Sequence, residues 1–262
     1  MYNLSGDTMK INKIKKLNNG KYKIELDNNE KITTYDDVII KNKLLYKKEL
    51  DHEEFNQLNI DNNYYHIYNK TVNYITKRLR SKKEVYKYLE KFELDSNDCN
   101  NIIEKLTSIN LIDDNKFAKA YISDRLYLSN DGPAKIRRAL IDYGVEDNII
   151  ETEINNISAE VIDEKINKII KKKMNSNHKY SLYILKQKLM VELINLGYER
   201  TDISKHLENY QETNDDIEKE YQKIYTKLSK KYSDSDLYYQ IKQKLYQKGY
   251  SSYEIDEVMK KE

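Results

Sequence analysis

The sequence predicts a mainly α-helical protein whose tandem three-helix repeats form an elongated, curved rod, with a small β-rich module at the N-terminus. Three observations lead to this fold class: the composition, a motif that returns at a constant interval, and an alternating pattern confined to the first part of the chain. Charged residues make up 34%, mean hydropathy is −0.91, and 262 residues include only six glycines and one proline. This composition suits long solvated helices and argues against a β-sandwich or a TIM barrel.

The repeated motif is a leucine followed four residues later by glycine and then by an apolar residue. It occurs at Leu140–Val145, Leu193–Tyr198 and Leu245–Tyr250, and Leu89–Leu94 matches in register with Glu93 in the glycine position. The four leucines are 51, 53 and 52 residues apart. A constant period near 52 residues indicates tandem structural units, each of which needs its neighbour to bury its apolar face.

The stretch from Asp114 to Val145 shows one repeat most clearly. Asp114 is expected to cap a first helix, and residues 129–132 form a break. Pro133 then stands at the first position of a second helix, where proline is tolerated. An apolar stripe at helical spacing follows in that helix, formed by Ile136, Ala139, Leu140 and Tyr143. Gly144 occupies the place that favours a left-handed C-cap.

The N-terminal module has a hydrophobic period of two. Strands are predicted over residues 11–17, 21–26 and 31–35, and Asn18-Asn19-Gly20 is a hairpin turn signal between the first two. Asp51 with Glu54 forms a capping box for a helix. Residues 61–63, Asp-Asn-Asn, are interpreted as a linker into the helical repeats, and residues 1–8 show no pattern of ordered structure.

The chain therefore divides into one module and four repeats. The predicted ranges are 1–63 for the β-rich module, then 64–113, 114–160, 161–212 and 213–262 for the repeats. Ser81 with Glu84 and Ser251 with Glu254 are further capping boxes. Cys99 lies in an apolar stripe and is interpreted as a small core residue.

Residues that would carry catalysis or hold a metal are not grouped in the sequence. None of the four histidines pairs with another at i+3 or i+4, and one cysteine excludes an internal disulfide. Phosphate-binding loops, dinucleotide fingerprints and nucleophile elbows are absent. We expect no enzymatic activity and no cofactor. Without a long apolar run or a signal peptide, we also expect a soluble, cytoplasmic protein.

Basic residues cluster at the joints of the repeats. Because the formal net charge is only +2, any acidic partner must be attracted by local clusters. A single cluster is most simply a solvated helix face, but recurrence at the repeat period predicts a basic stripe for a periodic, acidic partner. The candidate contact residues are Arg78, Arg80, Lys82, Lys83, Lys87, Arg125, Lys135, Arg137, Arg138, Lys186, Lys188, Lys242 and Lys244.

The repeats resemble the RecX family, bacterial regulators of the RecA recombinase. The matching residues are Ser81, Glu84, Val85 and Leu89, then Leu111–Asp114, then Phe117, Ala118, Tyr121, Arg125, Gly132, Pro133, Ile136, Arg137, Leu140, Gly144 and Val145. The resemblance runs from about Tyr64 to the C-terminus, and the N-terminal extension looks like the longer form found in Firmicutes. The chain departs from the family pattern at Glu93, where glycine is expected.

The resemblance implies a function in homologous recombination, DNA repair and the SOS response. RecX-like proteins bind the RecA–single-stranded DNA filament in its helical groove, inhibit its recombinase, ATPase and coprotease activities, and promote net filament disassembly. The leading hypothesis is therefore a monomeric, non-enzymatic RecA modulator, with direct contact to single-stranded DNA as a further possibility. Two alternatives remain. A DNA-binding protein that acts on naked single- or double-stranded DNA without RecA predicts a steep salt dependence, and a purely structural interaction rod predicts binding that is indifferent to salt.

Overall fold

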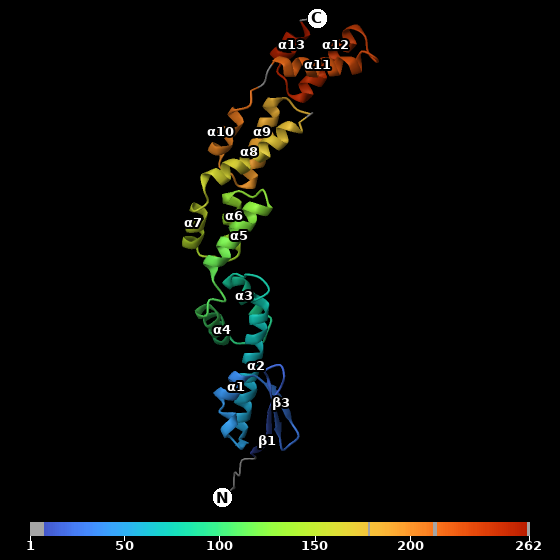
Figure 1. Ribbon diagram of the computed structural model, residues 1–262. Helices are drawn as coiled ribbons and strands as arrows, with labels where there is room; N and C mark the ends of the chain where they lie inside the picture. Colours follow the sequence, from blue (N-terminus) through green and yellow to red (C-terminus); the bar gives the residue numbers. More distant parts are fainter. Residues whose placement is uncertain (1–7, 178, 212–213, 261–262) are drawn as a thin grey trace. The chain divides into compact units, whose positions relative to one another are not determined.

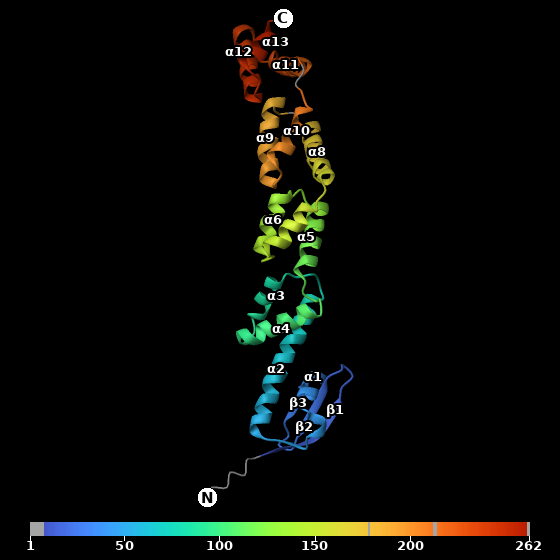
Figure 2. The same ribbon diagram turned by 90° about the vertical axis from the view of Figure 1, so that its left-hand side faces the viewer.

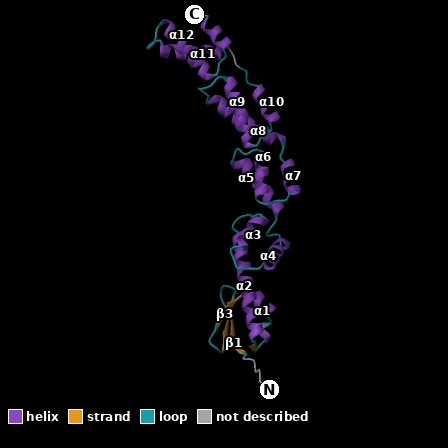
Figure 3. Ribbon diagram, turned by 180° about the vertical axis from the view of Figure 1, so that it is seen from behind, coloured by secondary structure: helices purple, strands orange, loops and turns teal. Residues whose placement is uncertain are grey.

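The computed structural model describes residues 8–177, 179–211 and 214–260 (Figure 1). Residues 1–7, most of the segment in which no ordered structure is predicted, lie outside this description. The described residues contain four β-strands and thirteen α-helices, and helix predominates, as predicted (Figure 3). The chain forms two compact units, which we describe separately. The first comprises Met1–Phe117 with Tyr143–Val145, and the second Ala118–Asp142 with Glu146–Glu262.

An antiparallel sheet opens the first unit. Its strands are β1 (Met9–Lys16), β2 (Tyr22–Leu26), β3 (Lys31–Thr34) and β4 (Glu49–Leu50), in the order β3-β2-β1-β4. The predicted turn between β1 and β2 contains Gly20 at a φ of 78°, which glycine adopts without steric cost. Ile14 pairs with Ile24, and Ile24 with Ile32, so the apolar residues of three strands lie on one face.

The apolar face of the sheet packs on α1 (Asp36–Lys41), the 3₁₀ turn η1 (Leu44–Tyr46) and α2 (His52–Ile75). The capping box of Asp51 and Glu54 at the start of α2 is confirmed. The linker predicted at residues 61–63 was wrong, because α2 continues through it without a break. Asp61 is the reason: its buried carboxylate faces α1 and accepts three hydrogen bonds, so tertiary contacts override the low helix propensity of an Asp-Asn-Asn stretch.

The first repeat consists of the end of α2 with α3 (Lys82–Leu89) and α4 (Ser96–Ser108). Its core is formed by the apolar residues that the helical period selects, namely Ile75, Val85, Leu89, Cys99, Ile102, Ile103, Leu106 and Ile112. Cys99 is buried here, as predicted, and the capping box of Ser81 and Glu84 is confirmed.

The predicted cap of the following helix was displaced by one residue. In α5 (Asp114–Leu128) the carboxylate of Asp113, rather than that of Asp114, accepts the backbone N–H of Lys116 at 3.1 Å. This bond, with the ion pair to the Lys116 ammonium, lowers the pKa of Asp113. Asp114 accepts the backbone N–H of Lys82 at 2.8 Å instead, so it satisfies a donor at the start of α3.

The remaining helices complete three further repeats. They are α6 (Pro133–Asp142), α7 (Asp147–Asn155), α8 (Ala159–Asn175), α9 (Leu182–Leu196), α10 (Arg200–Glu208), α11 (Asn214–Leu228), α12 (Asp234–Lys248) and α13 (Ser252–Met259). Helices α8–α10 and α11–α13 each enclose an apolar core, centred on Leu193 and Leu245 respectively. The three-helix unit is thus the repeating element, as predicted, while the exact residue ranges of the domains stay predictions.

Within the second unit, the middle helices of successive repeats meet end to end. The backbone N–H groups of Gly132 and Ala134, at the start of α6, donate to the carbonyl oxygens of Leu196 and Gly197, at the end of α9, at 2.7 and 3.1 Å. A helix start has unpaired donors and a helix end has unpaired acceptors, so this arrangement satisfies both and aligns their dipoles favourably.

The same junction recurs between α9 and α12. The backbone N–H of Ser181 donates to the carbonyl of Lys248 at 2.7 Å, and its hydroxyl donates to the carbonyl of Gly249 at 3.0 Å. Each motif glycine lies against the start of the preceding middle helix, where a side chain would collide. Gly144 in the first unit lies likewise against the side chain of Lys83.

This packing explains why Glu93 stands where the motif predicts glycine. Glycine is required where the end of a middle helix meets the start of the preceding one. The first repeat follows the β-rich module rather than another three-helix unit, so α3 has no such helix start to meet, and Glu93 is exposed. The position of this repeat in the array therefore explains why its copy of the motif tolerates a residue other than glycine.

Tyr198, next to Gly197, offers a test of the junction. Its side chain is 4% exposed, its hydroxyl has no hydrogen-bond partner among the described residues, and burial, with a smaller contribution from Asp131, raises its pKa to about 12. We expect Tyr198→Phe to leave the free energy of unfolding unchanged or raise it by up to about 1 kcal/mol, because an unpaired buried hydroxyl is removed and the ring is kept. Urea unfolding followed by circular dichroism measures this, with Tyr198→Ala as the cavity-forming control. A loss above about 1 kcal/mol in Tyr198→Phe would contradict an unpaired hydroxyl.

Candidate partner-binding surface

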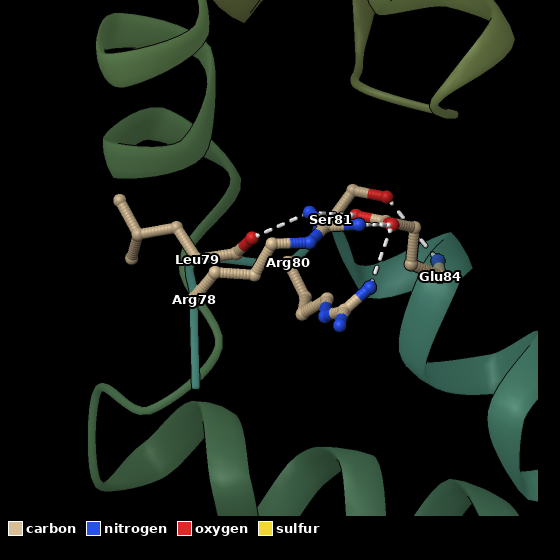
Figure 4. A network of polar contacts seen from close by, with 5 residues as sticks. All are labelled: Arg78, Leu79, Arg80, Ser81 and Glu84. Atoms are coloured by element: carbon tan, nitrogen blue, oxygen red, sulfur yellow. Dashed lines mark hydrogen bonds and ion pairs between the residues drawn. The ribbon is translucent and has the colours of Figure 1, made fainter. Parts of the chain in front are cut away.

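Two of the predicted contact residues, Arg78 and Arg80, converge on one carboxylate in the turn before α3 (Figure 4). Glu84 Oε1 lies 2.6 Å from Nη2 of Arg78 and 3.3 Å from Nη1 of Arg80. Nη1 of Arg78 also donates to the carbonyl of Leu79 at 2.9 Å, and Oε2 of Glu84 accepts the backbone N–H of Ser81. The capping glutamate therefore neutralises part of this cluster and fixes the turn.

Arg80 in particular is a packed residue. Its side chain is 16% exposed, and its guanidinium lies 4.0 Å from the ring centroid of Tyr74. Tyr74 in turn stacks on Tyr88 with a centroid separation of 4.0 Å and an interplanar angle of 4°. A guanidinium over an aromatic face is stabilised by the ring quadrupole. Arg80 thus connects the turn before α3 to α2 through Tyr74 and to α3 through Glu84.

Three lysines of the first unit lie on the surface of α3. Lys82, Lys83 and Lys87 are all exposed. Neither Lys82 nor Lys87 has an ion pair with a carboxylate in the described part of the chain, and the stem of Lys83 covers Gly144. Of the basic cluster in this unit, Lys82 and Lys87 are therefore the charges that are open to a partner.

In the second unit, two predicted contact residues hold their own repeat together. Nη2 of Arg137 donates to Oε2 of Glu151 at 2.8 Å, and Nζ of Lys242 lies 2.7 Å from Oδ1 of Asp256. Each pair joins a middle helix to the third helix of the same repeat, and each cation stands three residues before the motif leucine. The hydrogen bond with Asp256 raises the pKa of Lys242. The same pair thus occurs in the second and fourth repeats, whereas the equivalent positions of the first and third are Tyr86 and Met190.

Asp131, which lies just before α6, forms ion pairs with two further candidate residues. Its carboxylate lies 2.6 Å from Nζ of Lys135 and 3.9 Å from Nη1 of Arg125. Burial alone would raise the pKa of Asp131, but hydrogen bonds from Lys135 and Ser129 and the nearby Arg125 charge lower it overall. The carboxylate stays ionised near neutral pH and compensates part of this basic cluster.

A groove of about 710 Å³ brings Lys135 and Lys188 together within the second unit. It is lined by Lys135, Gln187, Lys188, Val191, Glu192, Asn195 and Leu196. Nζ of Lys188 also lies 4.7 Å from the ring centroid of Tyr180. Of the remaining candidates, Arg138 and Lys244 are exposed and Lys186 is half-buried.

Twelve of the thirteen predicted residues fall into two groups, and Lys83, whose stem covers Gly144, is placed in neither. We call the residues without an ion pair to a carboxylate, among the residues described, the open basic set: Lys82, Lys87, Arg138, Lys186, Lys188 and Lys244. Arg78, Arg80, Arg125, Lys135, Arg137 and Lys242 are paired within their own unit. Alignment of the clusters along one side of the whole chain stays a prediction.

Four lysines at the end of α11 and in the turn after it were not among the predicted contact residues. Lys223, Lys227, Lys230 and Lys231, with Gln222 and Thr226, line a groove of about 660 Å³. Lys223 and Lys227 lie one turn apart on α11, and Lys230 and Lys231 follow the end of the helix at Leu228. Four lysines within nine residues are a signal in the sequence, but they lie at and after the end of the first helix of a repeat, away from the joints where the predicted clusters lie.

The described residues contain neither a metal-binding cluster nor a membrane-spanning helix. Across residues 8–177, 179–211 and 214–260, no three His, Cys, Asp or Glu side chains are placed so that they could hold a metal ion. The helices of these segments are also too short or too polar for any of them to cross a lipid bilayer.

Successive three-helix units, each with a basic middle helix, define a helical-repeat protein. Two family models match: the one described as the first three-helix domain of RecX covers residues 68–106, and the one described as the second covers 113–153. The regulatory protein RecX of Streptococcus agalactiae (strain NEM316) is 33% identical over 96% of this chain and 99% of its own length. That of Streptococcus uberis is 31% identical over 96% and 98%. The chain belongs to the RecX family.

Solved structures agree with this fold. A crystal structure of regulatory protein RecX has a TM-score of 0.68 and 23% identity, and the match covers 76% of this chain and 98% of that one. The crystal structure of RecX from Lactobacillus salivarius has a TM-score of 0.54 and 26% identity, with coverage of 56% and 96%.

Proposed function

We propose that this protein binds the RecA–single-stranded DNA filament in the bacterial cytoplasm and inhibits RecA recombinase, ATPase and coprotease activities. Family membership over almost the whole chain supports a regulatory function of this type. The open basic set is the surface that we assign to filament binding. The paired arginines and lysines form ion pairs within the first, second and fourth repeats and contribute to the packing of those repeats.

One observation supports this surface above all. Lys87 of α3 and Arg138 of α6 each stand two residues before the motif leucine of their repeat, both are exposed, and neither has an ion pair among the residues described. Two successive repeats thus present a cation at the same helix position. A repeated cation on a repeated unit suits a partner whose acidic groups are themselves periodic, as in a nucleoprotein filament.

The first test is ATP hydrolysis by the cognate RecA on single-stranded DNA, with the protein added at increasing substoichiometric ratios. We expect a progressive loss of hydrolysis well below one protein per RecA. If hydrolysis persists until the protein saturates the DNA itself, competition for naked DNA becomes the better explanation. RecA-independent DNA binding would then replace the proposed function.

The Lys87→Ala/Arg138→Ala variant tests the surface. Each lost surface charge is worth up to about 1 kcal/mol, so the concentration for half-inhibition should rise about threefold to tenfold and depend less on salt, with unchanged helicity. The matched control is Lys171→Ala/Lys172→Ala, which removes the same charge from exposed positions of α8. Equal effects in the two double variants would remove this surface from the mechanism.

A further inference from the structure

The β-rich module has one sheet face that the proposed function does not use. Ile14, Ile24 and Ile32 lie on the opposite face and pack on the core with α1 and α2, which Figure 1 shows on the same side of the strands. Figure 2 shows the strands and α2 in the perpendicular view. On the second face, which we call the open face, the described residues Lys13, Lys15 and Lys31 are exposed.

Lysines dominate this open face. The strand register places Lys13 beside Glu25 and Glu25 beside Lys31, and in the next row Lys15 beside Lys23 and Lys23 beside Thr33. Lys10 lies beside Glu49 at the edge formed by β4. The face thus carries five lysines and two glutamates, and Lys10, Lys13, Lys15 and Lys31 are exposed.

The carboxylates of this face are outnumbered. Nζ of Lys23 lies 3.1 Å from Oε1 of Glu25, and the hydrogen bond and charge of Lys23, with smaller contributions from the charges of Lys31 and Lys13, lower the pKa of Glu25. Lys15 stands directly opposite Lys23, and like charges in this relation destabilise a sheet. The excess of lysines on this face lowers the stability of the module. A contribution to stability therefore does not explain why the lysines are there.

Protection of a sheet edge does not account for it either. Lysines on edge strands commonly prevent pairing with other chains, which could explain Lys13 and Lys15 on the part of β1 that β4 does not reach. Lys23, however, is on β2, which has a neighbour on each side. A positive face that extends across a central strand indicates a ligand of opposite charge.

We propose that this face binds the phosphate backbone of double-stranded DNA, independently of base sequence. Lysines two apart on one strand, such as Lys13 and Lys15, are about 6.8 Å apart, about twice the ~3.4 Å rise per phosphate along one DNA strand. Single-strand binding relies on aromatic side chains that stack on bases. The aromatic Tyr22 lies with the core residues instead of on the open face, so duplex phosphates are the ligand that fits.

The test uses the full chain and DNA without RecA, so its failure is distinct from failure of the proposed function. Fluorescence anisotropy of labelled duplexes of unrelated sequence gives the affinity and its salt dependence. For Lys13→Gln/Lys15→Gln we expect a loss of at least about tenfold at ~0.1 M salt, and a decrease of about 1.8 in the slope of log affinity against log salt, since each phosphate contact contributes about 0.9.

Two controls keep the outcome interpretable. Lys171→Gln/Lys172→Gln removes the same charge elsewhere and should change the affinity less than about twofold. The thermal midpoint of Lys13→Gln/Lys15→Gln should be equal or higher, because the repulsion between Lys15 and Lys23 is removed. Equal losses in both double variants, an unchanged affinity, or tighter binding to single strands than to duplexes would each overturn the inference.

Discussion

Replacement of Gly197 by alanine is expected to lower the free energy of unfolding by about 3 to 5 kcal/mol. Gly197 has a φ of +94°, and a Cβ there would lie 2.5 Å from the backbone nitrogen of Lys135, at the start of α6. The left-handed backbone alone costs a residue with a side chain about 1 to 2 kcal/mol. Because the clash is with backbone atoms, the helix ends must separate, and the two junction hydrogen bonds, worth about 1 kcal/mol each, are lost as well.

Gly20→Ala is the matched control for this variant. Gly20 also has a positive φ, +78°, but a Cβ there would have no neighbouring atom within 4 Å. We therefore expect only the backbone cost of about 1 to 2 kcal/mol. Urea unfolding followed by circular dichroism at 222 nm compares the two. Equal destabilisation by both substitutions would mean that the end-to-end junction of α6 and α9 contributes nothing beyond backbone geometry.

Much of the fold could be predicted because the capping and turn residues indicate the same helices as the hydrophobic period. Ser251 with Glu254 shows this: the capping box needs only two residues three apart, and the structure contains it. Pro133 begins α6 and Gly144 is left-handed for reasons that act within one turn of chain. The period of 52 residues is the length of one structural repeat. The motif leucines, from Leu89 to Leu245, therefore occupy the same buried position in each repeat.

The predictions that failed depend on partners distant in the sequence. The linker at residues 61–63 has the composition of a turn, and only α1, folded against α2, makes Asp61 a buried helical residue. Asp113 and Asp114 are chemically identical, and the choice between them follows from a hydrogen bond to Lys82, more than thirty residues away.

The contact residues of the candidate site could be predicted only in part, for the same reason. The sequence shows where cations cluster, and nothing in it distinguishes Arg137 from Arg138. Glu151, fourteen residues later on α7, makes that distinction by pairing with Arg137. The open basic set could therefore be recognised only after the three helices of a repeat were packed together.

Asp61→Ala is expected to lower the free energy of unfolding of the first unit by about 2 to 3 kcal/mol. The Asp61 carboxylate is 4% exposed and accepts hydrogen bonds from Nζ of Lys41 at 2.8 Å, Nδ2 of Asn42 at 2.9 Å and Nε2 of Gln57 at 3.0 Å. Its removal takes the acceptor away from the half-buried Asn42 amide and from the exposed Gln57 amide. The loss stays below that of a fully buried ion pair, because the ammonium of Lys41 is 57% exposed and returns to water.

The pH dependence of the free energy of unfolding tests whether the charge of the Asp61 carboxylate causes this stabilisation. Burial alone would raise the pKa of Asp61, but the hydrogen bonds from Lys41, Asn42 and Gln57 outweigh it and lower the pKa. A carboxyl whose pKa is lower in the folded state stabilises the fold above its unfolded pKa and loses that contribution as pH falls through the folded pKa. The difference between the protein and Asp61→Ala should therefore shrink as pH falls below about 4. Glu30→Ala, an exposed carboxylate of the same module, should show no such difference. A gap that stays constant down to pH 2 would mean that packing, rather than the ionised carboxylate, is what Asp61 contributes.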